Sequence, residues 1–62
     1  MSESLLDVDG AAQRLGVSIR WVRRAVAERR VPFVKVGRHV RFREDDLSDY
    51  IERQTVPAVE VR

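Results

Sequence analysis

The sequence predicts a small α+β domain, mainly helical, in which three short helices are combined with one β-hairpin. Apolar residues recur at helical spacing in two stretches before residue 28 and again after residue 44. Between them lies FVKVGRHVRF, a run of β-branched and aromatic residues around one glycine. The chain has 62 residues and no cysteine, so we expect one small core that is held by packing alone.

The first two helices are predicted on either side of a short break at Gly16. Asp7 is a good N-cap for the first helix, Gly16 is placed to end it in a left-handed conformation, and Ser18 is placed to cap the second helix. The break is so short that a tight corner is expected. The apolar positions are Val8, Ala11, Ala12 and Leu15 in the first helix and Ile19, Val22, Ala25 and Val26 in the second.

The stretch after Pro32 predicts a two-stranded β-hairpin that turns at Gly37. With a three-residue loop over 37–39, four apolar residues share one face of the hairpin, while Lys35 and Arg41 share the other. A two-residue loop would mix apolar and basic residues on both faces. We therefore expect the three-residue loop. The four apolar residues are Val34, Val36, Val40 and Phe42.

Residues 44–53, EDDLSDYIER, predict a third helix with Leu47, Tyr50 and Ile51 on its inner face. Three acidic residues fall in its first turn, where they oppose the positive end of the helix dipole. Pro57 breaks the weak alternation in the rest of the chain. We therefore expect a single domain over residues 1–53 and a flexible tail over residues 54–62.

Charge is strongly segregated along the chain, although the net charge is only +2. Residues 14–43 hold nine arginines and Lys35 against Glu28 alone, a net charge of +9. The flanking segments are acidic. Arginine offers a forked donor that suits phosphate and the edge of guanine, although the preference for arginine over lysine also arises in G+C-rich genomes.

Two helices joined by a glycine corner are typical of a helix-turn-helix, in which the second helix enters the DNA major groove. An ordinary helical hairpin that binds no ligand has the same spacing. The residues on the exposed face of the second helix therefore have to distinguish the two interpretations. On a helical wheel, Arg20, Arg23 and Arg24 gather opposite the apolar arc. Like charges at this spacing repel one another. DNA phosphates and guanine would compensate for that repulsion, whereas a solvated surface normally mixes charges of both signs.

Trp21 lies at the border between the apolar arc of the second helix and its arginine face. Two roles are open for it: packing at the edge of the core, or direct contact with DNA. The hairpin repeats the basic pattern and resembles a wing whose tip reaches a phosphate or the minor groove. Its candidate DNA-binding residues are Lys35, Arg38, His39 and Arg41.

Other classes of function find little support in the sequence. His39 has no nearby nucleophile and no acidic residue to orient it, so no catalytic residue and no enzymatic activity are expected. One histidine and no cysteine argue against a metal site, and no cofactor is expected. There is no signal peptide and no apolar stretch of membrane-spanning length, so we expect a soluble cytoplasmic protein that does not bind membranes.

The chain resembles the excisionase-type winged helix-turn-helix domains, which are related to the DNA-binding domain of MerR regulators. The resemblance runs from Leu6 to Glu52, and its most specific parts are AAQRLGVS, VGRHVRF and DLSDYI. It implies that the second helix and the wing bind DNA, with Arg20, Trp21, Arg23 and Arg24 at groove-facing positions and Arg38 and Arg41 in the wing. Gly10 and Arg43 depart from the usual helix-capping residues. The long coiled coil of full MerR proteins is absent from this sequence, so a ligand-sensing switch is not expected.

The resemblance implies a phage excisionase, a recombination directionality factor that bends double-stranded attachment-site DNA and assists the integrase. The alternative is a small prophage-type transcriptional regulator that uses the same surface, since both functions need only DNA binding. A third class is a protein-interaction module whose arginines meet an acidic partner. The acidic third helix is explained by dipole matching and solubility, and it also fits head-to-tail self-association with the basic middle of another copy on DNA.

Overall fold

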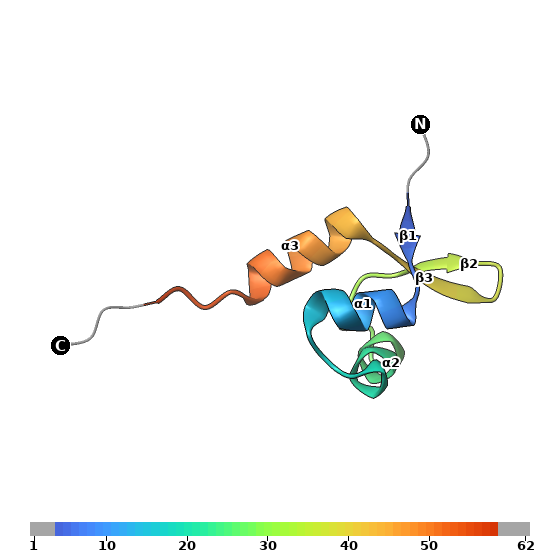
Figure 1. The fold of residues 1–62 in the computed structure, drawn as a ribbon, viewed down its shortest axis with the longest axis horizontal. Coiled ribbons are helices and arrows are strands. Elements are labelled where there is room, and N and C mark those ends of the chain that lie inside the picture. The colour runs from blue at the N-terminus through green and yellow to red at the C-terminus, as the bar shows by residue number, and fades with distance from the viewer. Residues whose placement is uncertain (1–3, 59–62) are drawn as a thin grey trace.

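The structure, a computed structural model, describes residues 4–58 and consists of three helices and a three-stranded antiparallel sheet. It is an α+β fold, mainly helical, with the arrangement of a winged helix-turn-helix. Figure 1 shows α3 and the β2–β3 hairpin extending in opposite directions from a body that contains α1 and α2. The elements are β1 Leu5–Leu6, α1 Val8–Leu15, α2 Ile19–Ala27, β2 Val34–Val36, β3 His39–Arg43 and α3 Glu44–Gln54.

The corner between α1 and α2 is fixed by hydrogen bonds at both helix ends. The Asp7 carboxylate accepts from the Gly10 N–H at 2.8 Å, and the Ser18 hydroxyl accepts from the Trp21 N–H at 3.0 Å. Gly16 has a φ of 72°, the left-handed conformation that a side chain disfavours. The Val17 N–H reaches back to the Ala12 carbonyl at 3.0 Å. The predicted caps and the tight corner are confirmed.

The C-terminal end of α2 repeats this geometry without a glycine. The Arg29 N–H donates to the Val26 carbonyl at 3.0 Å, and the Arg30 N–H donates to the Ala25 carbonyl at 2.8 Å, which is the Schellman pattern of bonds. Arg29 therefore adopts a φ of 56°, a left-handed conformation that costs a residue with a side chain about 1–2 kcal/mol. Nothing in the sequence pattern predicted this strained residue.

The sheet contains one strand more than the sequence predicted. Its order is β1-β3-β2, and β1 pairs antiparallel with β3 so that Leu5 lies opposite Arg43 and Leu6 lies opposite Phe42. Two residues are too few to show an alternating pattern, so β1 is invisible to periodicity. Its pairing fixes the N-terminal segment beside the base of the hairpin.

The hairpin turns through two residues, Gly37 and Arg38, so the predicted three-residue loop is wrong. Gly37 has a φ of 62°, whereas Arg38 does not have a positive φ, as in a type II′ turn whose twist matches that of the strands. The turn therefore sets the register in place of the apolar pattern. Val34 lies opposite Arg41, Lys35 opposite Val40 and Val36 opposite His39.

This register mixes apolar and basic residues on both faces of the hairpin. Lys35 and Arg41 lie on opposite faces, contrary to expectation, because directly paired residues share a face and neighbours along a strand alternate. Phe42 is fully buried, whereas Val36 on the other face is 46% exposed. The predicted single apolar face is thus wrong as well.

The core lies where α1, α2, β3 and α3 meet. Its buried residues are Ala11, Ala12, Val22, Ala25, Val31, Phe42 and Leu47. The Arg14 guanidinium connects α1 to α3 through the Glu44 carboxylate at 3.1 Å and the Ser48 hydroxyl at 2.8 Å. Arg43 gives no side-chain cap to α3, in keeping with its departure from the usual serine or threonine.

The predicted domain boundary lies within the last helix, because α3 includes Gln54. Thr55 to Ala58 are exposed and have no regular structure. The flexibility of the tail over residues 54–62 stays a prediction, and residues 59–62 lie outside the described residues.

Candidate nucleic-acid interface

The outer face of α2 is a cationic surface made by the alternation of buried and charged positions. Val22 and Ala25 are fully buried, and this fixes the rotation of the helix about its axis. Arg20, Arg23 and Arg24 are consequently exposed on the opposite side. Within residues 4–58, only Arg24 of these three forms a salt bridge. The charge of Arg20 and Arg23 is thus available to a ligand.

Glu28 connects the end of this face to a second arginine. One carboxylate oxygen accepts from Arg24 Nε at 3.1 Å, and the other accepts from Arg30 Nε at 2.8 Å. These hydrogen bonds, first from Arg24 and then from Arg30, hold the pKa of the Glu28 carboxyl below its ordinary value, since they favour the charged form. The charged form of the carboxylate therefore accepts from both arginines at once.

Trp21 occupies the border of the cationic face, and it is half-buried against the core. The Arg30 guanidinium lies 5.3 Å from the centre of its ring, which is within the range of a cation–π contact. Packing at the edge of the core is therefore observed. Direct contact between Trp21 and DNA stays a prediction.

A groove runs between α2 and the wing and brings together basic residues from both. Arg23 of α2 lines it together with Arg38, His39 and Arg41 of the wing. Arg41 is held there, since one of its terminal nitrogens donates to the Val40 carbonyl at 2.8 Å. Residues from two separate elements thus form one basic surface, as the helix-turn-helix hypothesis requires.

The groove continues past Arg23 and Arg41 toward the start of α1, where Asp7, Asp9 and Ile19 line it. Neither carboxylate forms a salt bridge with these arginines in the described part of the chain. Ile19 is 40% exposed rather than part of the core, contrary to the sequence prediction. It is the first residue of α2, where the helix has only begun to pack. An exposed isoleucine beside two arginines can contact a thymine methyl group.

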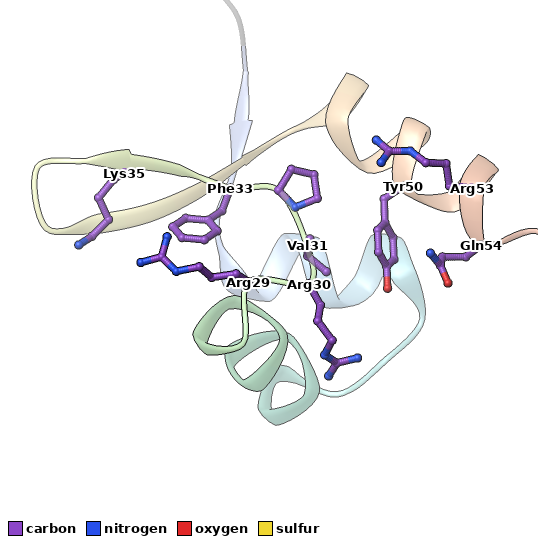
Figure 2. Close-up of a pocket in the computed structure, with 9 residues that line it drawn as sticks. Arg29, Arg30, Val31, Phe33, Lys35, Tyr50, Arg53 and Gln54 are labelled. Carbon is purple, nitrogen blue, oxygen red and sulfur yellow. The ribbon is translucent and has the colours of Figure 1, made fainter.

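Lys35 lies apart from the other predicted DNA-binding residues. It lines a different hollow together with Arg29, Arg30 and Arg53, and this hollow shares no residue with the groove between α2 and the wing. Figure 2 shows Arg53 and Arg30 pointing in opposite directions, while Arg29 extends toward the hairpin that carries Lys35. The structure thus joins three of the four predicted wing residues to Arg23 and separates the fourth.

Among residues 4–58, no helix is both long and apolar enough to cross a membrane. No group of three or more histidine, cysteine, aspartate or glutamate side chains in this part of the chain is arranged to hold a metal ion.

The sequence matches a known protein family. A family model described as a helix-turn-helix domain matches residues 5–55, which span every helix and strand of the structure. Comparisons with curated proteins and with solved structures find no match. The matched region includes both the basic face of α2 and the wing, so the match supports DNA as a partner. The chain therefore belongs to this family of helix-turn-helix domains.

Proposed function

We propose that the protein is a sequence-specific, DNA-binding architectural protein that acts as a phage excisionase. In this role it binds repeated sites in attachment-region DNA, bends the duplex and helps the phage integrase to assemble the excision complex. Strand cutting belongs to the integrase, and this protein contributes no catalytic residue. It works in the cytoplasm of the bacterial host, bound to DNA.

The observation that carries the proposal is the basic groove shared by α2 and the wing. Arg20 and Arg23 face outward from the helix that enters the major groove in a helix-turn-helix complex. Arg38 and Arg41 lie beside Arg23, on an element placed to reach the flanking backbone or the minor groove. Contacts at two adjacent grooves of one duplex support bending as well as binding.

Bending is the energetically demanding part of this role. A site of 20–30 base pairs bent through 40–90° stores on the order of 1–6 kcal/mol, which several adjacent protomers can share. The exposed acids Asp45, Asp49 and Glu52 on α3 support head-to-tail contact with the basic middle of the next copy. We therefore expect cooperative binding to repeated sites.

The DNA-binding surface is tested by the salt dependence of affinity for duplex DNA. The logarithm of the affinity should fall by about 0.9 per logarithmic unit of salt for each phosphate that is neutralised. Arg41→Ala should reduce this slope by about 1, and Arg20→Ala should relax base preference. Lys35→Ala and Arg53→Ala remove the same charge outside the groove and should have smaller effects. A flat salt response would instead favour a protein-interaction module.

The excisionase role is tested by integrase-mediated excision in vitro with and without the protein. We expect stimulation on attachment-site DNA that carries the repeats, and loss of that stimulation with Arg20→Ala. An integrase gene adjacent to this one would agree with the assignment. Absence of stimulation on the cognate sites would refute the excisionase role. Binding to a promoter operator in place of an attachment region would support the transcriptional regulator.

A further inference from the structure

Glu28 is the only carboxylate among residues 14–43, and it contacts Arg24 on the outer face of α2. Both of its oxygens are engaged, one by Arg24 Nε at 3.1 Å and the other by Arg30 Nε at 2.8 Å. Arg30 is itself placed over the ring of Trp21. The Glu28 carboxylate that binds Arg24 is therefore also held by Arg30, whose side chain packs on Trp21 at the edge of the core.

The contact with Glu28 decides which donors of Arg24 remain available. A guanidinium group has five N–H donors, and Glu28 takes the one on Nε. The two terminal nitrogens remain, and the Arg24 side chain is 75% exposed. A pair of terminal N–H groups matches the O6 and N7 acceptors of guanine, the commonest specific contact in the major groove. Holding the long side chain also reduces the conformational entropy that binding would otherwise remove.

The same contact contributes little to folding. Glu28 and Arg24 are exposed by 46% and 75%, and salt bridges between such exposed groups contribute little to stability. A substitution at Glu28 should therefore leave a folded protein whose DNA binding can be measured. When DNA covers the pair and removes water, the interaction between the two charges becomes stronger.

We propose that Glu28 is a positioning residue for base readout: it holds Arg24 so that its terminal nitrogens meet one guanine, and it restrains Arg24 from binding phosphates without regard to sequence. This inference rests on the proposed DNA-binding function. Without Glu28, Arg24 moves freely and the molecule gains one unit of positive charge. Discrimination at one base pair should then decrease while affinity for unrelated DNA increases.

The test is selection from a pool of randomised duplexes with the purified full chain, followed by binding measurements on the selected duplex and on its single-base variants. Arg24→Ala identifies the base pair that Arg24 reads, where a bidentate contact discriminates roughly 5- to 150-fold. Glu28→Gln should lower discrimination at that same base pair by at least about fivefold, within the range of such a contact. In the Arg24→Ala background, Glu28→Gln should change base preference no further.

Glu44→Gln is the matched control, because it makes the same chemical change and also weakens an exposed salt bridge with an arginine, Arg14 at 3.1 Å, away from the outer face of α2. It should leave discrimination intact. Equal effects of Glu28→Gln and Glu44→Gln would show that only net charge matters and would overturn the inference. Unchanged base preference in Arg24→Ala would overturn it too, while DNA binding itself would stand. If the unaltered protein selects no sequence, both this inference and sequence-specific DNA binding fail.

Discussion

Replacing Arg29 by glycine should stabilise the protein, although it removes a large side chain from the surface. Arg29 ends α2 with a φ of 56°. Gly16 holds the corresponding position at the end of α1 with a φ of 72° and the same pattern of backbone hydrogen bonds. Arg29 is exposed and forms no salt bridge with another described residue. The substitution therefore changes the stability of the protein mainly through the backbone conformation of residue 29.

Two opposing contributions set the magnitude of this effect. A side chain in the left-handed region costs about 1–2 kcal/mol, and glycine relieves that strain. Glycine also makes the unfolded chain more flexible, which costs about 0.5–1 kcal/mol. The difference ranges from zero to about 1.5 kcal/mol, and its midpoint is a net stabilisation of about 0.75 kcal/mol. In a domain of this size, the midpoint corresponds to an increase of roughly 3–6 °C in Tm.

Thermal and urea unfolding followed by circular dichroism at 222 nm would measure the effect. Arg29→Ala is the matched control, because it removes the charge but keeps a Cβ in the left-handed region, so it should not reproduce the stabilisation. Gly16→Ala makes the opposite change at the equivalent position and should destabilise by about 1 kcal/mol. A fall in Tm for Arg29→Gly, together with the expected loss for Gly16→Ala, would refute the reasoning from backbone strain.

Three further predictions follow from contacts at helix ends and between helices. Ser18→Ala should destabilise the protein by about 1 kcal/mol, measured by urea unfolding, because the Trp21 N–H loses its acceptor. Arg14→Met should cost less than about 1 kcal/mol in the same assay, since its bonds to α3 are partly exposed. NMR titration should give Glu28 a pKa below its ordinary value, and Arg24→Ala should raise it. Because folding lowers this pKa, the stabilisation is complete above the ordinary value and is lost as the pH falls through the lowered one.

The sequence predicted the helices and their corner well because the deciding interactions are local. Asp7 and Ser18 each cap an N–H three residues further along the chain, and Gly16 closes a bond pattern within one helical turn. Side-chain chemistry and short spacing are sufficient to identify such features. The basic face of α2 was predictable for the same reason, since helical periodicity places every third or fourth residue on one side.

The sequence did not predict the features that depend on contacts between distant residues or on backbone geometry. β1 exists because Leu6 pairs with Phe42, which lies far away in the sequence. The strained conformation of Arg29 follows from how α2 ends, and no residue type indicates it. Gly10 was interpreted as a missing capping residue, but a Cβ there would lie 3.3 Å from the Leu6 side chain. A side chain at this position would therefore require Leu6 to shift by a few tenths of an ångström, a contact between β1 and α1 that the local sequence does not indicate.

The two-residue turn of the wing also changes which basic side chains lie on the same surface. The sequence prediction chose the longer loop because it separates apolar from basic residues, but a glycine with positive φ favours a turn that gives the opposite register. Arg41 consequently shares a groove with Arg23, whereas Lys35 lines a separate hollow. A count of positive residues therefore overstates the charge that one duplex can meet at the same time. Fewer positive side chains share one surface than the sequence implied, so the proposed base readout depends more on how each arginine on the outer face of α2, Arg24 above all, is oriented.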